Sequence, residues 1–294
     1  VAWYKRVKEP KQQLEDVAQL FLGVRMQCAQ CHHHPFERWS QDDYYSFAAF
    51  FTQVGRKPTG TRGEDLIFHK RGTATAKNVK TGEALKPAAF GDDVGEISPD
   101  ADPRLRLADW MSSKENPFFA KALVNRYWKH FFTRGLIEPE DDIRDTNPPT
   151  NPELLAALEE HFIRSGFDLK SLIREITRSS AYQLSSKPNN YNLVDRQNYS
   201  RYYPKRMQAE VLLDSIDFLT GAKTTFANLP PGTRAVALPD NSYNRASPLL
   251  QVFGRPNSLS VCECERVQSS SLAQSLHLIN SSEIKSKLAY ASGR

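Results

Sequence analysis

The chain has 294 residues, of which 39% are hydrophobic and 11% aromatic, so it can bury a core in one large domain or two modest ones. Its 39 Lys and Arg residues are scattered among 34 Asp and Glu residues, and the net charge of +5 is too evenly spread to indicate a nucleic-acid partner. No stretch approaches the roughly 18 apolar residues of a membrane-spanning helix.

The start of the sequence is informative because it is not a typical leader. It begins at Val1 rather than Met, and the first residues already have helical character. No signal peptide is visible. We therefore expect a processed product or a fragment of a longer parent protein that carries further domains.

A first helix is predicted over about Lys11–Val24. Leu14, Val17 and Phe21 recur at helical spacing, and Gly23 is a residue typical of a helix end. Residues 28–32 follow directly, so this helix leads into the most distinctive motif of the chain.

That motif is Cys-Ala-Gln-Cys-His, the C-x-x-C-H pattern of covalent haem attachment. Cys28 and Cys31 can form thioethers with the two vinyl groups of one porphyrin, and His32 is then placed to bind the iron. The pattern predicts a c-type haem protein that matures outside the cytoplasm, in the periplasm or in secreted form.

The sixth iron ligand and a rival metal stay open at this stage. A His or Met from the far side would close the haem site. The candidates are Met26, His34, His69, Met111, His130, Met207 and His277. Alternatively Cys28, Cys31, His32 and His34 could supply the ligands of a zinc site, although ligands so close in sequence would be cramped.

The next elements are a second helix and a small β insertion. The helix is predicted over Asp42–Gln53, with Asp42 or Asp43 as its N-cap. Residues 55–99 are rich in Gly, Thr, Lys and Asp. Short strands are expected at Leu66–His69 and at Ala76–Val79, and the second is followed by a turn at residues 80–83.

From residue 102 onward the sequence indicates helices. The predicted starts are Asn116 with Pro117, Asn151 with Pro152, and Asp168, since each places a capping side chain before the first apolar positions. Further helices are expected over Lys205–Leu219 and Leu272–Leu288, with irregular structure over about 222–261. The fold class is therefore mainly α: a helical cytochrome-like segment with a small β insertion in residues 1–100, then a helical domain in residues 101–294.

Three polar groups in this second part have more than one interpretation. Cys262 and Cys264 form a possible second thiol site that could be bonded, free or metal-bound, and no His follows them as haem attachment requires. The acidic run of Glu138, Glu140, Asp141, Asp142 and Asp145 lacks calcium-loop spacing, so a solvated acidic loop is expected. Asn125, Arg126 and Trp128 are expected to hold a core in register.

Taken together, the motifs resemble two adjacent planctomycete domains of unknown function. The first part is similar to the planctomycete cytochrome-C-like domain at Phe21–Arg25, Cys28–His32, His34–Phe36, Trp39, Asp43–Tyr45 and Phe50–Phe51. The rest resembles the planctomycete-specific domain that usually follows it, at Asp102–Arg104, Asn116–Phe118, Asn125–Trp128, Asn151–Leu155, Asp168–Lys170, Arg206–Met207, Phe253–Pro256, Cys262–Arg266 and His277–Asn280. The resemblance implies a secreted or periplasmic protein, often part of a longer one with another cytochrome module, and it implies no settled activity.

The functional expectation combines the motif with this resemblance. We expect an extracytoplasmic protein with one haem c that transfers electrons to or from a redox partner protein. One alternative is a structural or interaction module whose Cys and His residues hold zinc or a disulfide. Another is a haem enzyme with an open iron face, such as a peroxidase-like activity. No P-loop, dinucleotide fingerprint, nucleophile elbow or zinc-protease motif is present, so the sequence nominates no catalytic residue.

Overall fold

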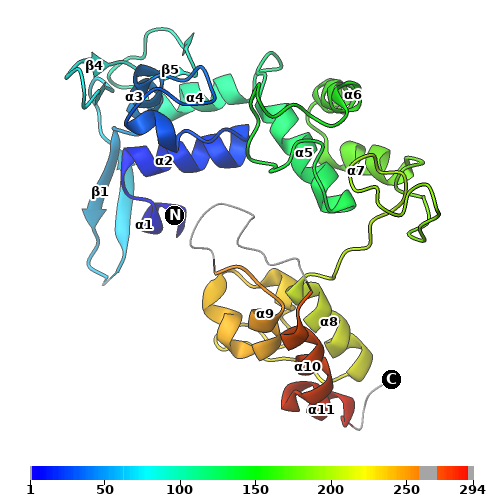
Figure 1. Ribbon diagram of the computed structural model, residues 1–294. Helices are drawn as coiled ribbons and strands as arrows, with labels where there is room; N and C mark the ends of the chain where they lie inside the picture. The colour runs from blue at the N-terminus through cyan, green and yellow to red at the C-terminus, as the bar shows by residue number, and fades with distance from the viewer. Residues whose placement is uncertain (1, 62, 258–269, 291–294) are drawn as a thin grey trace. The chain divides into compact units, whose positions relative to one another are not determined.

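The chain is mainly helical, as predicted. The computed structural model describes residues 2–61, 63–257 and 270–290. They divide into two compact units, Val1–Tyr203 and Pro204–Arg294 (Figure 1). Cys262 and Cys264 lie outside the described residues, so the possible second thiol site stays a prediction, and so does the predicted domain boundary after residue 100.

The first unit contains seven α-helices and three two-stranded sheets among its described residues. Its helices are α1 (Ala2–Arg6), α2 (Pro10–Val17), α3 (Gln41–Ala49), α4 (Pro103–Met111), α5 (Phe119–Phe132), α6 (Pro152–Arg164) and α7 (Leu169–Arg178). Two short helices of other types are the π-helical η1 (Ala18–Leu22) and the 3₁₀-helical η2 (Gln27–Gln30). The predicted first helix is thus α2 extended by η1, and Gly23 ends it in the left-handed conformation with φ 67°.

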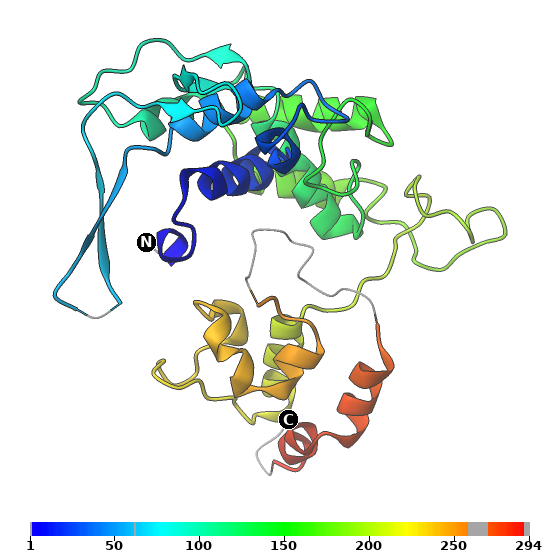
Figure 2. The same ribbon diagram turned by 60° about the vertical axis from the view of Figure 1, so that its left-hand side comes forward.

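The β insertion lies between α3 and α4, as expected. Its strands are β1 (Val54–Pro58), β2 (Asp65–His69), β3 (Ala76–Lys77), β4 (Ala84–Leu85), β5 (Ala88–Ala89) and β6 (Asp92–Asp93), paired antiparallel in that order. The β1–β2 hairpin projects from the body formed by α2 and α3, with α1 beside it (Figures 1 and 2). The Arg56 guanidinium, from the middle of β1, joins the hairpin to this N-terminal segment by donating to the backbone carbonyls of Tyr4 and Val7, at 2.5 and 3.0 Å.

Two hydrophobic cores support the first unit. The first is formed by α2, η1, α3 and α4 around Tyr44, Phe47, Phe50 and Trp39, and Phe90 of the insertion stacks on Trp39 at 4.7 Å between ring centroids. The second lies between α5, α6 and α7, where Trp128 stacks on Phe132 at 4.1 Å. Phe118 and Phe119, at the start of α5, pack against the first core. The C-x-x-C-H segment and the helices α4 to α7 are therefore packed together in one unit, whereas the later helices belong to the second unit.

The second unit is a smaller helical body. It contains α8 (Ala209–Thr220), η3 (Ala235–Ala237), η4 (Asn241–Ala246), α9 (Pro248–Val252), α10 (Leu272–Asn280) and α11 (Ser282–Leu288) among its described residues. Leu213, Leu249, Leu250 and Phe253 form the centre of its core. The single helix predicted over Leu272–Leu288 is two helices, because Ser281 leaves the helical conformation with ψ 131°.

The helix caps confirm the sequence interpretation in two cases and correct it in two. Asn151 and Asp168 accept hydrogen bonds from backbone N–H groups two or three residues on, as predicted. Asn116 accepts from the N–H groups of Phe118 and Phe119 in the turn before α5, whose N-cap is Phe118, so Asn116 and Pro117 precede the helix instead of starting it. The N-cap of α3 is Ser40 rather than an Asp, since Ser40 and Asp43 bond each other's backbone reciprocally.

Candidate functional site

The C-x-x-C-H residues form a single tight turn around η2. The Cys28 carbonyl accepts hydrogen bonds from the N–H groups of Cys31 and His32, each at 3.4 Å. Ala29 donates to the Met26 carbonyl at 2.9 Å, and the side chains of both Met26 and Ala29 are fully buried in the first core. Met26 and Ala29 therefore point into the core, whereas the two residues between them lie at the surface.

Helix α3 holds the far side of this turn. The Gln30 carbonyl accepts from the Gln41 side-chain amide at 3.0 Å and from the Tyr45 hydroxyl at 3.3 Å. Tyr45 is itself buried, with its ring edge against Tyr44 at 5.2 Å. Because the Gln30 carbonyl is fixed by a helix that belongs to the core, the backbone between the two cysteines is positioned by tertiary structure.

The functional side chains of the motif lie at the surface. Cys28 and Cys31 are both free thiols and both exposed. The His32 ring is exposed too, and its Nδ1 lies 2.7 Å from the His33 backbone carbonyl. With the ring proton on Nδ1 this nitrogen donates to the carbonyl, and Nε2 keeps its lone pair. A hydrogen bond of this kind is the usual partner of a metal-binding imidazole, since it fixes the tautomer and the ring orientation.

His34 has different surroundings although it is only two residues away. It is buried, its N–H donates to the Trp39 carbonyl at 2.9 Å, and its Nδ1 accepts from the Phe36 N–H at 3.3 Å. Burial, together with the nearby Arg144 guanidinium, lowers the pKa of His34 below its ordinary value. This arrangement uses His34 to shape the turn, and its assignment as a metal ligand stays a prediction.

The acidic run is not the solvated loop that the sequence predicts, because two of its carboxylates are buried. Asp141 is 2% exposed and accepts hydrogen bonds from the side chains of Gln19 and Arg25. Both partners belong to the segment that leads into the C-x-x-C-H turn. The separation in sequence, more than 110 residues, hides this pairing from any local pattern.

Backbone contacts reinforce the same junction. The Ile143 N–H donates to the Gly23 carbonyl at 2.8 Å, and a Cβ on Gly23 would lie only 2.6 Å from Ile143 Cδ1. The Arg126 guanidinium donates to the Gln19 carbonyl at 2.9 Å. Residues 138–145, which we call the acidic clamp, therefore fix the π-helical segment that immediately precedes the C-x-x-C-H turn.

The acidic clamp is tied in turn to helix α5. Lys129 donates to the carboxylates of Glu138, at 2.7 Å, and Glu140. Asn125 is fully buried and bonds both backbone groups of Ile137, donating to its carbonyl at 2.8 Å and accepting from its N–H at 2.9 Å. The expectation that Asn125 holds a core in register is confirmed by this pair of bonds.

The clamp also touches the residues that follow the motif. The Arg144 guanidinium lies over the Phe36 ring, 5.2 Å from its centroid, and the Asp145 N–H donates to the Glu37 carboxylate at 3.1 Å. Residues on both sides of the C-x-x-C-H turn are thus held by one loop. Sequence reasoning missed this role, and the only local signal was the pair Leu136 and Ile137, whose apolar side chains beside the acidic run indicate burial.

The candidate distal ligands are dispersed in the structure. Met26 lies inside the first core and is fully buried. His69 is on β2, Met111 ends α4 against the first core, and His130 is exposed on α5. Met207 and His277 belong to the second unit. Over the described ranges, no three His, Cys, Asp or Glu side chains are gathered so that they could hold a metal ion.

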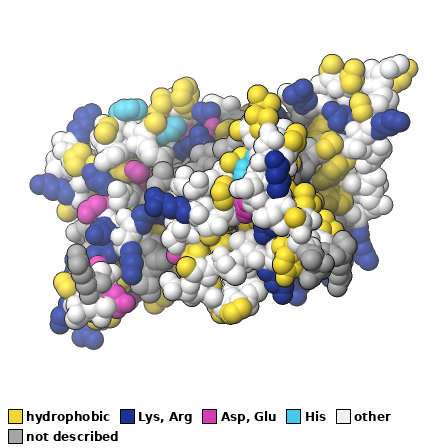
Figure 3. Space-filling model, turned by 90° about the horizontal axis from the view of Figure 1, so that it is seen from below, with side chains coloured by type: hydrophobic (Ala, Val, Ile, Leu, Met, Phe, Trp, Pro, Cys, Tyr) yellow, Lys and Arg dark blue, Asp and Glu magenta, His cyan; other side chains and the backbone are white. Residues whose placement is uncertain are grey.

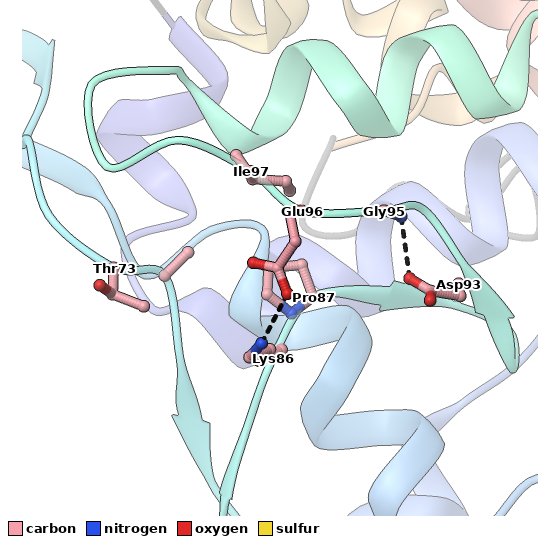
Figure 4. A pocket seen from close by; sticks show the side chains of 8 residues that line it. Thr73, Lys86, Pro87, Asp93, Gly95, Glu96 and Ile97 are labelled. Atoms are coloured by element: carbon pink, nitrogen blue, oxygen red, sulfur yellow. Dashed lines mark hydrogen bonds and ion pairs between the residues drawn. The ribbon is translucent and has the colours of Figure 1, made fainter.

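A separate cavity of about 340 Å³ lies in the β insertion (Figure 4). It is lined by Thr73, Ala74, Lys86, Pro87, Asp93, Gly95, Glu96 and Ile97. The ion pair of Lys86 and Glu96, at 2.8 Å, crosses it, but both side chains are largely exposed. None of the site residues predicted from the sequence lines this cavity.

Comparison with known families matches two segments of the chain. Residues 103–292 match the family PSD1, described as a protein of unknown function (DUF1553). Residues 2–56, which contain the whole C-x-x-C-H turn and α3, match PSCyt2, described as a protein of unknown function (DUF1549), a planctomycete cytochrome C-like domain. These matches confirm the resemblance seen in the sequence. No curated protein and no solved structure matches the chain. No described helix is long and apolar enough to span a bilayer.

Proposed function

Since the chain belongs to the PSD1 family and carries a PSCyt2 segment at its N-terminus, we propose that it is a c-type haem protein that transfers electrons. The observation that carries this proposal is the chemistry of the exposed turn. It presents two free thiols, Cys28 and Cys31, and directly after them an exposed imidazole, His32. Bound haem would supply one-electron redox chemistry through its iron.

The donor set of the turn fits haem. Each cysteine S–H can add across one vinyl group, which forms a carbon–sulfur bond and moves the thiol hydrogen to the other vinyl carbon, so attachment needs no oxidant. His32 offers Nε2 to the iron while Nδ1–H is held by the His33 carbonyl. Three exposed apolar side chains, Leu20, Phe21 and Phe36, flank the motif in sequence and would cover part of the porphyrin.

The fixed backbone around the turn supports a redox role. The α3 contacts and the acidic clamp hold the attachment turn from both sides, which limits the movement that electron gain or loss would otherwise require. The proposal includes a redox partner protein and a periplasmic or secreted location, because thioether attachment of haem takes place outside the cytoplasm. Further domains of a parent protein belong to the same proposal.

The test is expression of the full chain together with a haem-attachment system. We expect the denatured protein to exceed its polypeptide mass by one haem, with a Soret band and sharp α and β bands after reduction. Cys28→Ala combined with Cys31→Ala should abolish the covalent mass increase. His33→Ala, which changes an exposed neighbour, is the matched control and should retain it.

Other outcomes distinguish the alternatives. A colourless protein of bare polypeptide mass that contains stoichiometric zinc would contradict the haem proposal and favour the zinc-bound interaction module. A haem protein whose spectrum shifts with carbon monoxide or cyanide would have an open iron face, which favours the peroxidase-like alternative over electron transfer.

A further inference from the structure

The segment between α7 and the end of the first unit forms a closed surface loop. Residues 186–201 leave and return at one place, because the Tyr202 N–H donates to the Ser185 carbonyl at 3.2 Å. In Figures 1 and 2 this segment projects beyond α7. A loop of this length with adjacent ends is an Ω-loop, a type that is frequently functional. We call residues 186–201 the Ω-loop.

Side-chain hydrogen bonds give the Ω-loop a defined shape. Asn189 Oδ1 accepts from the N–H groups of Tyr191 and Asn192, at 2.9 and 3.1 Å, and Asn192 Nδ2 reaches across the loop to the Ser200 carbonyl at 3.2 Å. Asp195 accepts from the N–H groups of Gln197, at 3.0 Å, and Asn198, at 3.1 Å. These hydrogen bonds fix the conformation of the Ω-loop, so the residues at its tip are held in place.

The foot of the Ω-loop is fixed in the second core. Tyr199 is buried, with its ring edge 5.3 Å from Trp128 and 5.4 Å from Phe132 between centroids. Its hydroxyl donates to the Gly135 carbonyl at 2.8 Å. Since Tyr199 is locked in this way, substitutions at the tip should leave the fold of the unit intact.

The tip presents three large apolar side chains to the solvent. Tyr191 is 97% exposed, Val194 86% and Leu193 61%. Each apolar side chain that stays in water forgoes the free energy that burial would give it. The Ω-loop holds three apolar side chains toward the solvent within four residues. Such a tip is suited to insertion into an apolar environment.

The charge around this tip is strongly one-sided. Residues 178–203 contain four basic residues, Arg178, Lys187, Arg196 and Arg201, and one acidic residue, Asp195, a net charge of +3. The Asp195 carboxylate is occupied by hydrogen bonds from Ser200 and its neighbours, and these hold its pKa well below its usual range. The Ω-loop lies at the right of Figure 1, and the turn about the horizontal axis keeps it at the right of Figure 3. At that end, Figure 3 shows yellow hydrophobic side chains next to blue Lys and Arg side chains.

We propose that the Ω-loop docks the protein on an anionic lipid surface, with Tyr191, Leu193 and Val194 entering the interface and the surrounding Arg and Lys side chains contacting the headgroups. Tyrosine is enriched at membrane interfaces because its ring is apolar and its hydroxyl polar. Apolar area and cationic charge together are what bind peripheral proteins to anionic lipid. The net charge of +3 complements such a surface, and for that reason lipid is favoured over a neutral protein pocket.

The experiment is cosedimentation of the full chain with vesicles of phosphatidylcholine containing about a third phosphatidylglycerol, and with phosphatidylcholine alone. We expect binding to the mixed vesicles. Combined Tyr191→Ser, Leu193→Ser and Val194→Ser should weaken it by at least about tenfold. The matched control carries Leu66→Ser, Val79→Ser and Leu105→Ser, which remove three apolar side chains that are more than half exposed elsewhere in the same unit, and should bind as the parent does.

Two further measurements separate insertion from simple charge attraction. Lys187→Gln with Arg196→Gln should weaken binding by about 25-fold at low salt, since each basic residue near an anionic surface strengthens binding about fivefold. Tyr191→Trp should add an emission component, relative to the parent, that moves to shorter wavelength only with the mixed vesicles.

Several results would overturn the proposal. One is the absence of sedimentation with mixed vesicles. Another is equal binding by the parent and the tip variant, since the apolar tip would then play no part. If the parent ignores vesicles but self-associates at high concentration while the tip variant stays monomeric, the Ω-loop is a protein contact and the lipid assignment is wrong.

Discussion

The C-x-x-C-H turn and the acidic clamp lie against each other, and they use their polar residues in opposite ways. In the turn, Cys28, Cys31 and His32 are exposed and the backbone makes the fixing contacts. In the clamp, Glu140 and Asp141 are buried and their side chains make the fixing contacts. The difference teaches that residues available for chemistry are those the fold does not use, whereas the charged residues around them support the structure.

The largest expected effect comes from Asn125 of α5, which holds Ile137, the residue directly before the clamp. Asn125→Leu removes both hydrogen bonds to Ile137 and leaves the buried backbone N–H and carbonyl of Ile137 without these partners. The free energy of unfolding should therefore fall by about 3 kcal/mol. Urea denaturation measures it. Asn190→Leu, the same change at an exposed asparagine, should stay within about 0.5 kcal/mol. Equal losses in the two variants would contradict the structural role of Asn125.

The second effect tests the pairing between the clamp and the segment before the turn. Asp141→Ala leaves Arg25 and Gln19 without their shared acceptor. Because the Arg25 side chain is 39% exposed and water can solvate it, we expect a loss of about 2 kcal/mol, less than for a fully buried pair. Asp145→Ala, at an exposed position of the same loop, is the control. If Asp141→Ala is neutral, the clamp does not stabilise the turn.

A third pair of variants sharpens the contrast inside the turn itself. His34→Ala removes the acceptor of the Phe36 N–H and opens space in a buried site, so it should cost about 1.5 kcal/mol of stability while leaving the proposed haem attachment intact. His32→Ala should leave the stability of the haem-free chain almost unchanged and alter the absorption spectrum of the loaded protein. The reverse pattern would show that the two histidines have exchanged roles.

Capping of α6 gives a smaller effect, far from the turn. Asn151→Ala removes the acceptor of the Leu154 N–H, at 3.0 Å, and should lower the free energy of unfolding by about 1 kcal/mol. Asn151→Asp keeps an acceptor and should lose much less. Both variants should retain the absorption spectrum of the loaded protein, so a spectral change would mean that α6 influences the site.

The smallest effect is a dependence on pH. Burial and the Arg144 charge lower the pKa of His34 below 6.5, so below that pH the unfolded chain binds more protons than the folded one. Stability should therefore be lost as the pH falls from about 6.5 toward the lowered pKa. The urea midpoint at pH 7.5 and at about 5.5 measures it, and His34→Gln should reduce the difference. An unchanged difference would place the titrating group elsewhere.

Much of the fold could be predicted because it depends on short-range rules. The caps at Asn151 and Asp168, the helix end at Gly23 and the β insertion between α3 and α4 all follow from residues within a few positions of one another. Predicted helix boundaries were wrong where two neighbouring residues can each serve as the N-cap, as Ser40 and Asp42 can. They were also wrong where one residue interrupts a periodic pattern, as Ser281 does. In both places the hydrophobic pattern is equally compatible with the predicted and the observed boundary.

The sequence by itself determined the mainly helical class, the family resemblance and the identity of the chemical motif, because periodicity, capping and C-x-x-C-H spacing are local properties. Only the tertiary structure decided that Asp141 is buried against Arg25, that His34 is buried while His32 is exposed, and that Tyr199 fixes a loop whose tip faces solvent. The physical reason is that burial of a polar group depends on partners far away in the chain. Arg25 and Asp141 are 116 residues apart, and no pattern over a few turns of helix records such a pair.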